Sequence, residues 1–161
     1  MKFIIEQVAL CPPDGAKAIE LLKALGLTDW VTDHVTAAGE VFGKQARNEA
    51  DLSFNYQAVN DEGTKPALEL EVLSYTEGAN WMASKERRGS VSHLGMHCTA
   101  VELLEWRKKL TELDIQVAQE VFTSSHTNPA IAGLRRYNYV IFNTRAILGV
   151  DLKFIVRYNA A

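Results

Sequence analysis

The sequence predicts an α+β protein built from two similar β-α-β-β-β modules, and three observations support this prediction. A short strand pattern that leads into an amphipathic helix pattern occurs near residue 7 and again near residue 93. The segments 68–73 and 150–155 both mix apolar and charged residues with the period of a strand. Neither half of the 161-residue chain is large enough to bury a stable core alone, so we expect the halves to share one.

The first module should begin with a strand over residues 2–10, which are rich in Ile, Val and Phe. Asp14 is a suitable N-cap for a helix that runs through Leu25, with Gly26 as its C-terminal stop. Short strands separated by Gly39 and other turn residues should follow, at residues 30–31, 35, 41–42, 52–56 and 67–75.

The second module should repeat this order. Thr99 and Glu102 form a capping box that opens a helix, and Trp106 lies on the apolar face of that helix. Three strands should follow, at residues 115–122, 137–143 and 150–158.

We therefore predict one domain, with module 1 at residues 1–75, an inter-module loop at 76–91 and module 2 at 92–161. The modules should form a curved mixed sheet with helices outside and a concave cleft inside. Gln7 and His93 occupy matching places in the two opening strands, so their side chains should face a common space.

The composition of the chain limits the classes of molecule that we expect the protein to bind. A net charge of −3 and a pI near 5.8 give no reason to expect the broad positive surface that nucleic acid requires. No apolar run approaches the roughly 20 residues that span a bilayer, and the N-terminus does not resemble a secretory signal. We expect a cytoplasmic protein with a small-molecule ligand, without nucleic-acid or membrane partners, and with Cys11 and Cys98 as unpaired thiols.

The opening strands, Gln-Val-Ala-Leu from Gln7 and His-Leu-Gly-Met from His93, and the acidic residues within the closing strands resemble those of the vicinal oxygen chelate superfamily. Glyoxalase I, extradiol dioxygenases and bleomycin resistance proteins belong to it. The resemblance covers essentially the whole chain. It implies the glyoxalase/bleomycin resistance/dioxygenase fold, a homodimer, and a divalent metal (Zn, Ni, Mn or Fe) held by the first and last strand of each module.

Carried onto this sequence, the resemblance implies Gln7 as the first metal ligand, Glu71 as the second and His93 as the third. Glu69 has the same strand parity as Glu71, so a register shift of two residues would exchange them. A bound metal would act as a Lewis acid on adjacent substrate oxygens, with Glu71 as a catalytic group. The alternative is that these side chains simply bond to one another inside the sheet.

The fourth ligand position is where the sequence departs from the pattern. It falls on Lys153, which cannot bind a divalent metal while it is an ammonium. Asp151, two residues earlier on the same strand face, is the alternative ligand. Lys153 would then contact the substrate or pair with a buried carboxylate.

Four further residues are candidates for the site. His97 shares a strand face with His93 about two pleats deeper, and could act as a general base. His126 lies in a turn-rich loop, Arg136 belongs to an arginine pair suited to a carboxylate or phosphate, and Trp81 could cover the cleft. The competing interpretations are that His97 is a core residue, that His126 and Arg136 are surface residues, and that Trp81 packs within its loop.

Two functions of different classes follow from these residues. The first is a metal-dependent isomerase, lyase or dioxygenase acting on a small oxygen-rich substrate. The second is a metal-free protein that sequesters an aromatic or cationic small molecule, and the lysine at the fourth ligand position favours it. An adaptor that has kept the fold without the pocket is a third possibility.

Overall fold

The computed structural model describes residues 2–57, 68–78, 90–129 and 131–159. Within these ranges the chain forms eight strands and three helices. In chain order they are β1 (Gln7–Cys11), α1 (Gly15–Ala24), β2 (Trp30–Val41), β3 (Lys44–Asn55), β4 (Glu69–Gly78), β5 (Ser90–His97), α2 (Ala100–Glu112), β6 (Val117–Ser125), β7 (Arg135–Phe142), α3 (Arg145–Leu148) and β8 (Asp151–Asn159).

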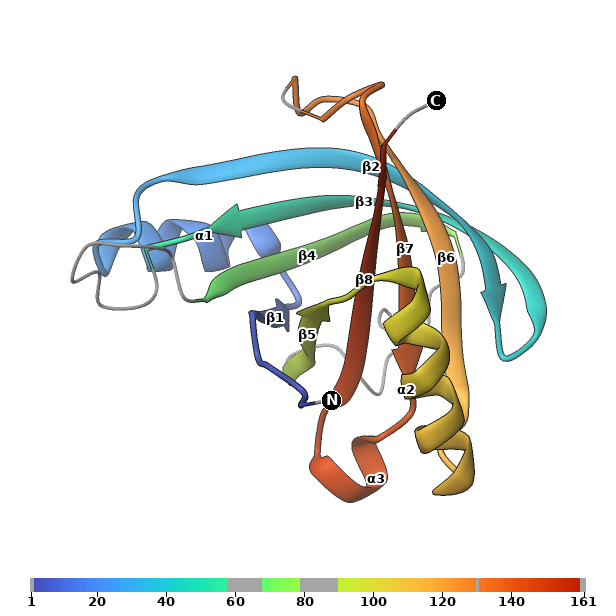
Figure 1. Ribbon diagram of the computed structural model, residues 1–161. Helices are drawn as coiled ribbons and strands as arrows, with labels where there is room; N and C mark the ends of the chain where they lie inside the picture. Colours follow the sequence, from blue (N-terminus) through green and yellow to red (C-terminus); the bar gives the residue numbers. More distant parts are fainter. Residues whose placement is uncertain (1, 58–67, 79–89, 130, 160–161) are drawn as a thin grey trace.

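The eight strands close into a mixed barrel in the order β1-β4-β3-β2-β6-β7-β8-β5 (Figure 1). Each half of the chain supplies four neighbouring strands, and its first strand pairs with its last in parallel. Antiparallel pairs β1–β5 and β2–β6 join the halves. The expected α+β class is confirmed, and the sheet closes into a barrel because both seams between the halves are hydrogen-bonded.

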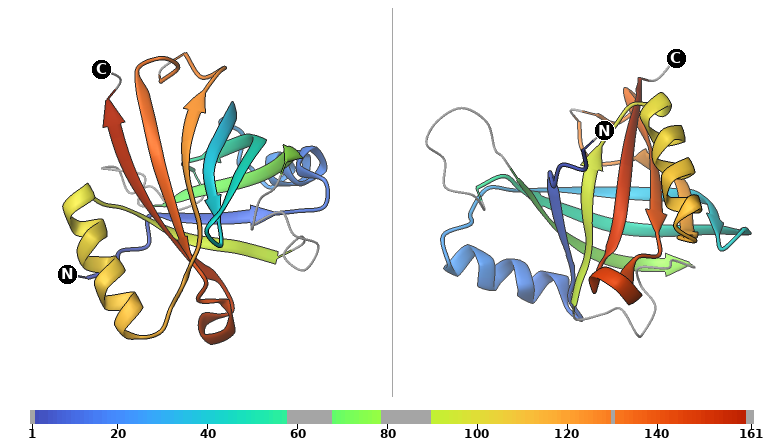
Figure 2. Two further views of the ribbon diagram at one scale, coloured as in Figure 1. Left: turned by 90° about the vertical axis from the view of Figure 1, so that its right-hand side faces the viewer. Right: turned by 60° about the horizontal axis from the view of Figure 1, so that its bottom comes forward.

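The helices lie on the outside of the barrel, α1 against β4 and α2 along β8 (Figures 1 and 2). Asp14 caps α1 by accepting a hydrogen bond from the Lys17 amide, as predicted. The predicted capping box of Thr99 and Glu102 is also present at α2. The short helix α3 was not predicted. Within the described residues, no helix is both long and apolar enough to cross a membrane.

The segments predicted as short strands near residues 30–42 form one twelve-residue strand, β2. Gly39 does not break it but lies inside it. A Cβ at Gly39 would come within 2.1 Å of the Glu120 carbonyl oxygen, so the glycine allows β2 and β6 to approach closely. The turn to β3 instead uses Phe42 and Gly43, whose φ angles of 47° and 70° suit a tight hairpin turn.

Two apolar clusters stabilise this arrangement. One fills the space between α2 and the outer side of the barrel, where Leu103 and Leu110 pack against Phe142 and Phe154, with Trp106 at the edge as predicted. The other lies inside the barrel and includes Val35, Leu52 and Leu73. The polar residues of the candidate site occupy the part of the interior that this second cluster leaves open.

The strand register shows which residues occupy equivalent positions in the two halves of the chain. Gln7 pairs with Glu69 and Ala9 with Glu71 between β1 and β4. In the second half, His93 pairs with Asp151 and Gly95 with Lys153 between β5 and β8. With Gln7 equivalent to His93, Glu71 is therefore equivalent to Lys153, and Glu69 to Asp151.

Candidate functional site

Four polar side chains meet inside the barrel: Gln7, Glu71, His93 and Lys153, each at most 3% exposed. His93 Nε2 lies 2.8 Å from Gln7 Oε1 and 3.2 Å from Glu71 Oε2. Lys153 Nζ donates to the same two oxygens, at 3.1 Å and 3.4 Å. The expectation that Gln7 and His93 face a common space is confirmed.

The strand next to Gln7 is shaped to accommodate this cluster. A Cβ at Gly95 would lie 2.9 Å from Gln7 Oε1 and 3.0 Å from Gln7 Cβ, closer than side chains normally approach. Glycine at this position on β5 therefore gives the Gln7 amide the room to reach across to Lys153 and His93.

The acceptors around His93 fix which of its nitrogens carries the proton. Gln7 Oε1 and the Glu71 carboxylate can only accept, so His93 donates from Nε2, while Nδ1 lies 3.3 Å from the Ser92 hydroxyl. Burial, followed by the positive charge of Lys153, lowers the pKa of His93 to about 4. The imidazole is therefore neutral at pH 7.

Glu71 carries the negative charge of the cluster. Burial alone would raise the pKa of this carboxyl, but the Lys153 ammonium and the His93 hydrogen bond outweigh burial, and the pKa is lowered. Glu71 Oε1 is buried and has no hydrogen-bond partner among the described residues. The cluster is thus a buried ion pair between Glu71 and Lys153, supported by two neutral side chains.

The three ligand positions that the resemblance implies do converge, but the cluster does not fit a divalent metal as it stands. The Lys153 ammonium already lies against the oxygens of Gln7 and Glu71 that a cation would use. A second cation there would be repelled at close range. Within the described parts of the chain, no three His, Cys, Asp or Glu side chains are arranged to share a metal ion.

A cavity of about 330 Å³ lies beside the cluster at one end of the barrel. It opens past Val31, Tyr56 and His97, all of which are exposed to solvent. The lining is largely aromatic and aliphatic, with Phe54, Tyr56, Tyr137, Tyr139, Val35, Leu52 and Ile155 among its residues. The Tyr139 ring also contacts Lys153 Nζ, 4.1 Å from the ring centroid, and so lies between the ion pair and the cavity.

Glu69 is the carboxylate of β4 that borders the cavity, whereas Glu71 does not. Tyr56 donates to Glu69 Oε2 at 2.6 Å, and the Gln7 amide donates to Glu69 Oε1. Burial, and then the nearby charge of Glu71, raises the pKa of Glu69. Both carboxylate oxygens accept hydrogen bonds, from Tyr56 and Gln7, and these bonds favour the anionic form of Glu69 against the effect of burial.

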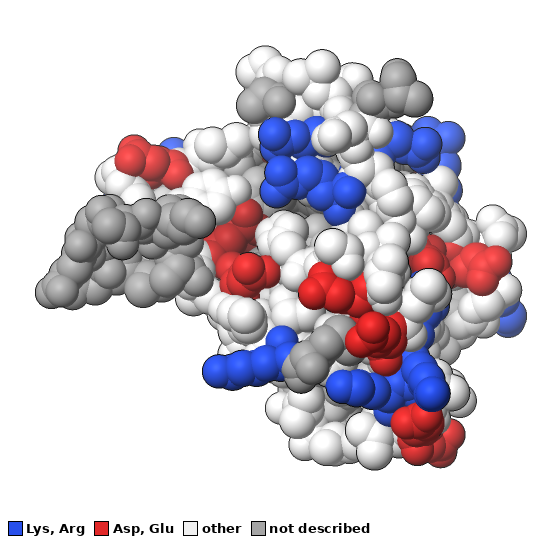
Figure 3. Space-filling model, viewed as in Figure 1, with Lys and Arg blue, Asp and Glu red and all other residues white. Residues whose placement is uncertain are grey.

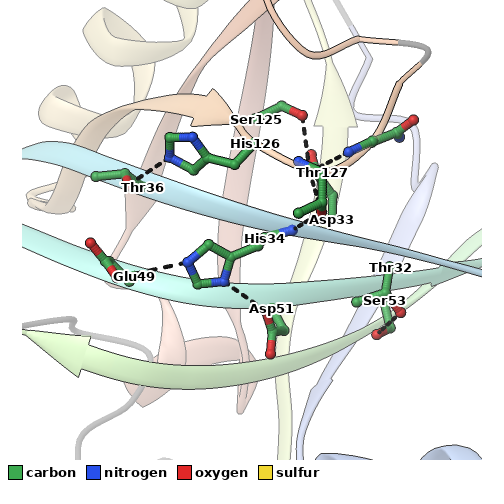
Figure 4. Close-up of polar contacts among 11 residues, drawn as sticks. Thr32, Asp33, His34, Thr36, Glu49, Asp51, Ser53, Ser125, His126 and Thr127 are labelled. Atoms are coloured by element: carbon green, nitrogen blue, oxygen red, sulfur yellow. Dashed lines mark hydrogen bonds and ion pairs between the residues drawn. The ribbon is translucent and has the colours of Figure 1, made fainter.

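Asp33 holds the rim of the cavity in place. Its Oδ1 accepts hydrogen bonds from the Ser125 hydroxyl, from the Thr127 amide and hydroxyl, and from the Asn128 amide (Figure 4). Asp33 is 2% exposed and lies on β2, so these bonds fix the segment after β6 against the opposite half of the barrel. That segment contributes Asn128 and Ile131 to the cavity wall.

His126, predicted as a site residue in a turn-rich loop, lies outside the cavity on the outer surface of the barrel. Its Nε2 is 2.8 Å from the Thr36 hydroxyl, and its ring is 6.0 Å from that of His34 (Figure 4). His34 Nδ1 is 2.8 Å from Asp51, and this hydrogen bond is the main cause of the raised pKa of His34. The turn after β6 directs the backbone, not the imidazole, toward Asp33.

The remaining predicted site residues are dispersed. His97 is not deeper than His93 but borders the open end, where its Nδ1 lies 3.3 Å from Glu6. Asp151 is buried at the far side of the ion pair, with a carboxylate oxygen 3.8 Å from Arg145 Nε. Arg136 is exposed over the Phe122 ring, at 5.8 Å. Trp81 lies outside the described residues.

Arg135, not Arg136, borders the cavity. The predicted candidate was the other member of this arginine pair, Arg136. Strand alternation could have decided between them, because Arg135 has the parity of Tyr137 and Tyr139, whose rings face the interior. Tyr56 could not have been found this way, because it lies just beyond the end of β3.

No family model matches this chain, and no curated protein sequence matches it. The surface viewed in Figure 3 carries Lys, Arg, Asp and Glu side chains interspersed, without a broad region of one sign among the residues coloured there.

Proposed function

We propose that this protein binds a small aromatic or cationic molecule, without a metal, in the cavity at the open end of its barrel. The observation that carries this proposal is that two glutamates on β4, Glu69 and Glu71, differ in their partners. Glu71 is neutralised inside the protein by Lys153, whereas Glu69 borders the cavity and, as far as the structure describes the chain, has only uncharged hydrogen-bond partners. A bound cation would supply the charge that Glu69 lacks.

The shape and lining of the cavity support a small ligand. Eight-stranded barrels are wide enough to hold one small molecule, and a volume of about 330 Å³ lies within the usual range of ligand pockets. Four aromatic side chains line it: Phe54, Tyr56, Tyr137 and Tyr139. Such faces favour planar rings and cations.

The pairing of the strands supports a relation between the fold of this protein and that of the vicinal oxygen chelate superfamily. Each half pairs its first and last strands in parallel, and a helix follows the first strand of each half. We infer that the two halves are duplicated modules of that fold, in which the metal-binding centre has become a charged structural core.

Calorimetric titration of phenethylamine into dialysed, chelator-treated protein tests the binding proposal. Tyr137→Ala removes one ring from the cavity wall and should weaken binding about tenfold. Tyr158→Ala is the matched control, because this tyrosine packs against Phe122 outside the cavity, with ring centroids 6.2 Å apart. Equal losses in the two variants, or no binding to wild type, would contradict the proposal.

Metal-dependent isomerase, lyase or dioxygenase chemistry is the second candidate function. The convergence of Gln7, Glu71 and His93, together with the unbonded Glu71 Oε1, favours it. It requires Lys153 to leave the cluster or lose its proton. Addition of Zn, Ni, Mn or Fe to metal-free protein tests it, because a metalloenzyme would bind one of these ions stoichiometrically and gain thermal stability.

A further inference from the structure

Glu69 and Arg135 carry opposite charges, border the cavity and have no charged partner among the described residues. Within that part of the chain Glu69, on β4, is hydrogen-bonded to the Tyr56 hydroxyl and the Gln7 amide alone. Arg135, on β7, is half-buried, and among the described residues its guanidinium makes no hydrogen bond or ion pair. Charges left unpaired beside a cavity are suited to charges on a ligand.

The other charged groups around the cavity are already engaged. Lys153 and Glu71 pair with each other behind the Tyr139 ring. Asp33 Oδ1 receives four hydrogen bonds from the segment at 125–128. His97 is paired with Glu6. Asp33 has no charged partner among the described residues either, but it is only 2% exposed and binds the rim. Glu69 and Arg135 are partly exposed, so within the described residues they are the charges that a ligand in the cavity can reach.

The barrel places these two charges on opposite sides of the cavity. In the closed strand order, β4 and β7 are separated by three strands in either direction. From strand spacing and tilt, a regular eight-stranded barrel is about 16 Å across between backbones, and the two long side chains shorten that gap to roughly the length of one substituted ring. The rings of Phe54, on β3, and Tyr137, on β7, line the same cavity.

We propose that the ligand is a zwitterionic aromatic molecule whose ammonium and carboxylate stand at opposite ends, the ammonium bound by Glu69 and the carboxylate by Arg135. This inference rests on the proposed binding function and adds the second, anionic contact. The guanidinium fork can bind a carboxylate through two parallel hydrogen bonds, which gives this end orientation as well as affinity.

Three probes that differ by one charge test the inference by calorimetry at pH 7. They are 4-(aminomethyl)benzoate, its methyl ester, which lacks the anion, and 4-methylbenzoate, which lacks the cation. Each charge-assisted hydrogen bond increases the binding affinity about tenfold. The zwitterion should therefore bind about tenfold more tightly than either analogue. Equal binding of zwitterion and methyl ester would overturn the inference while leaving the proposed function intact, whereas no binding of any probe would overturn both.

Two variants assign the charges to their residues. Arg135→Gln should reduce the affinity for the zwitterion to that for the methyl ester, and leave binding of the ester unchanged. Glu69→Gln should reduce it to that for 4-methylbenzoate. Arg136→Gln, exposed over Phe122, and Glu77→Gln, exposed farther along β4, are the matched controls and should bind all three probes like wild type. Loss of ester binding in Arg135→Gln, or zwitterion binding unchanged in both cavity variants, would contradict the assignment.

Discussion

Lys153 and Glu71 occupy equivalent positions in the two halves of the barrel, and their side chains meet there as an ion pair, with Nζ 3.4 Å from Oε2. The near-symmetry of the fold thus brings a cation and an anion to one buried point. The Lys153 ammonium lies against the Gln7 and Glu71 oxygens that a bound metal ion would otherwise use. This relationship explains why the neighbouring cavity, not the buried centre, is the part of the interior open to a ligand.

Replacement of Lys153 by Met should destabilise the protein strongly. The substitution keeps an unbranched side chain that is one atom shorter, but it leaves Glu71 as an uncompensated buried charge, which typically costs about 3 to 5 kcal/mol of unfolding free energy. Urea denaturation measures the loss. Lys109→Met, with its ammonium 5.4 Å from the exposed side of Trp106, is the control and should lose less than about 1 kcal/mol. The double variant Lys153→Met with Glu71→Gln should recover part of the lost unfolding free energy. If Lys153→Met is as stable as wild type, the buried ion pair between Lys153 and Glu71 does not form.

Replacement of Lys153 by Glu should create metal binding. It removes the competing ammonium and adds a fourth donor to Gln7 Oε1, Glu71 and His93 Nε2. The variant should be less stable than wild type without metal, and Zn or Ni should raise its melting temperature while wild type does not respond. Lys109→Glu serves as the surface control. The same metal response in wild type and Lys153→Glu would place Lys153 outside the centre.

Stability should fall in mildly acidic solution because His93 must remain neutral in the folded protein. Its folded pKa of about 4 lies below the ordinary value of 6.5, so the unfolded chain binds more protons between these values. The unfolding free energy should therefore be fully present above pH 6.5 and decrease by roughly 3 kcal/mol as the pH falls to 4. Urea denaturation of His93→Gln should show a flatter dependence, whereas the surface variant His126→Gln should keep the wild-type slope.

Removal of the Asp33 carboxylate should loosen one wall of the cavity. Asp33→Ala leaves four donors without their shared acceptor, at a cost of about 2 to 3 kcal/mol, and hydrogen exchange should accelerate at the Thr127 and Asn128 amides. Asp51→Ala removes a half-exposed carboxylate that bonds to His34 on the outer surface, so it should cost less than about 1 kcal/mol. Unchanged exchange at 127–128 in Asp33→Ala would show that Asp33 does not hold this segment.

Local signals in the sequence predicted the fold class and several elements. The capping side chains of Asp14 and Thr99 identified both long helices, because a cap is determined by neighbouring residues. Closure of the barrel was not predictable, because the β1–β5 and β2–β6 seams depend on contacts between distant segments. Gly39 was misread for the same reason: its role is set by β6, more than eighty residues away.

The candidate site was predicted in part. Matching positions in the two halves indicated that Gln7 and His93 would meet, the family resemblance added Glu71 and Lys153, and the structure brings all four together. A concave cleft was expected, but which of Glu69 and Glu71 borders it was left open. That choice depends on the twist of β4 and on the packing of Tyr139, which are set by contacts between distant segments.

The most direct test of this account is a calorimetric titration of phenethylamine, carried out once with chelator present and once with added Zn. We predict one binding event per chain with the same affinity in both conditions, since Glu69 borders the cavity and Lys153 already supplies the positive charge beside Glu71. Binding that appears only when Zn is added would contradict the account and restore the metal-dependent function.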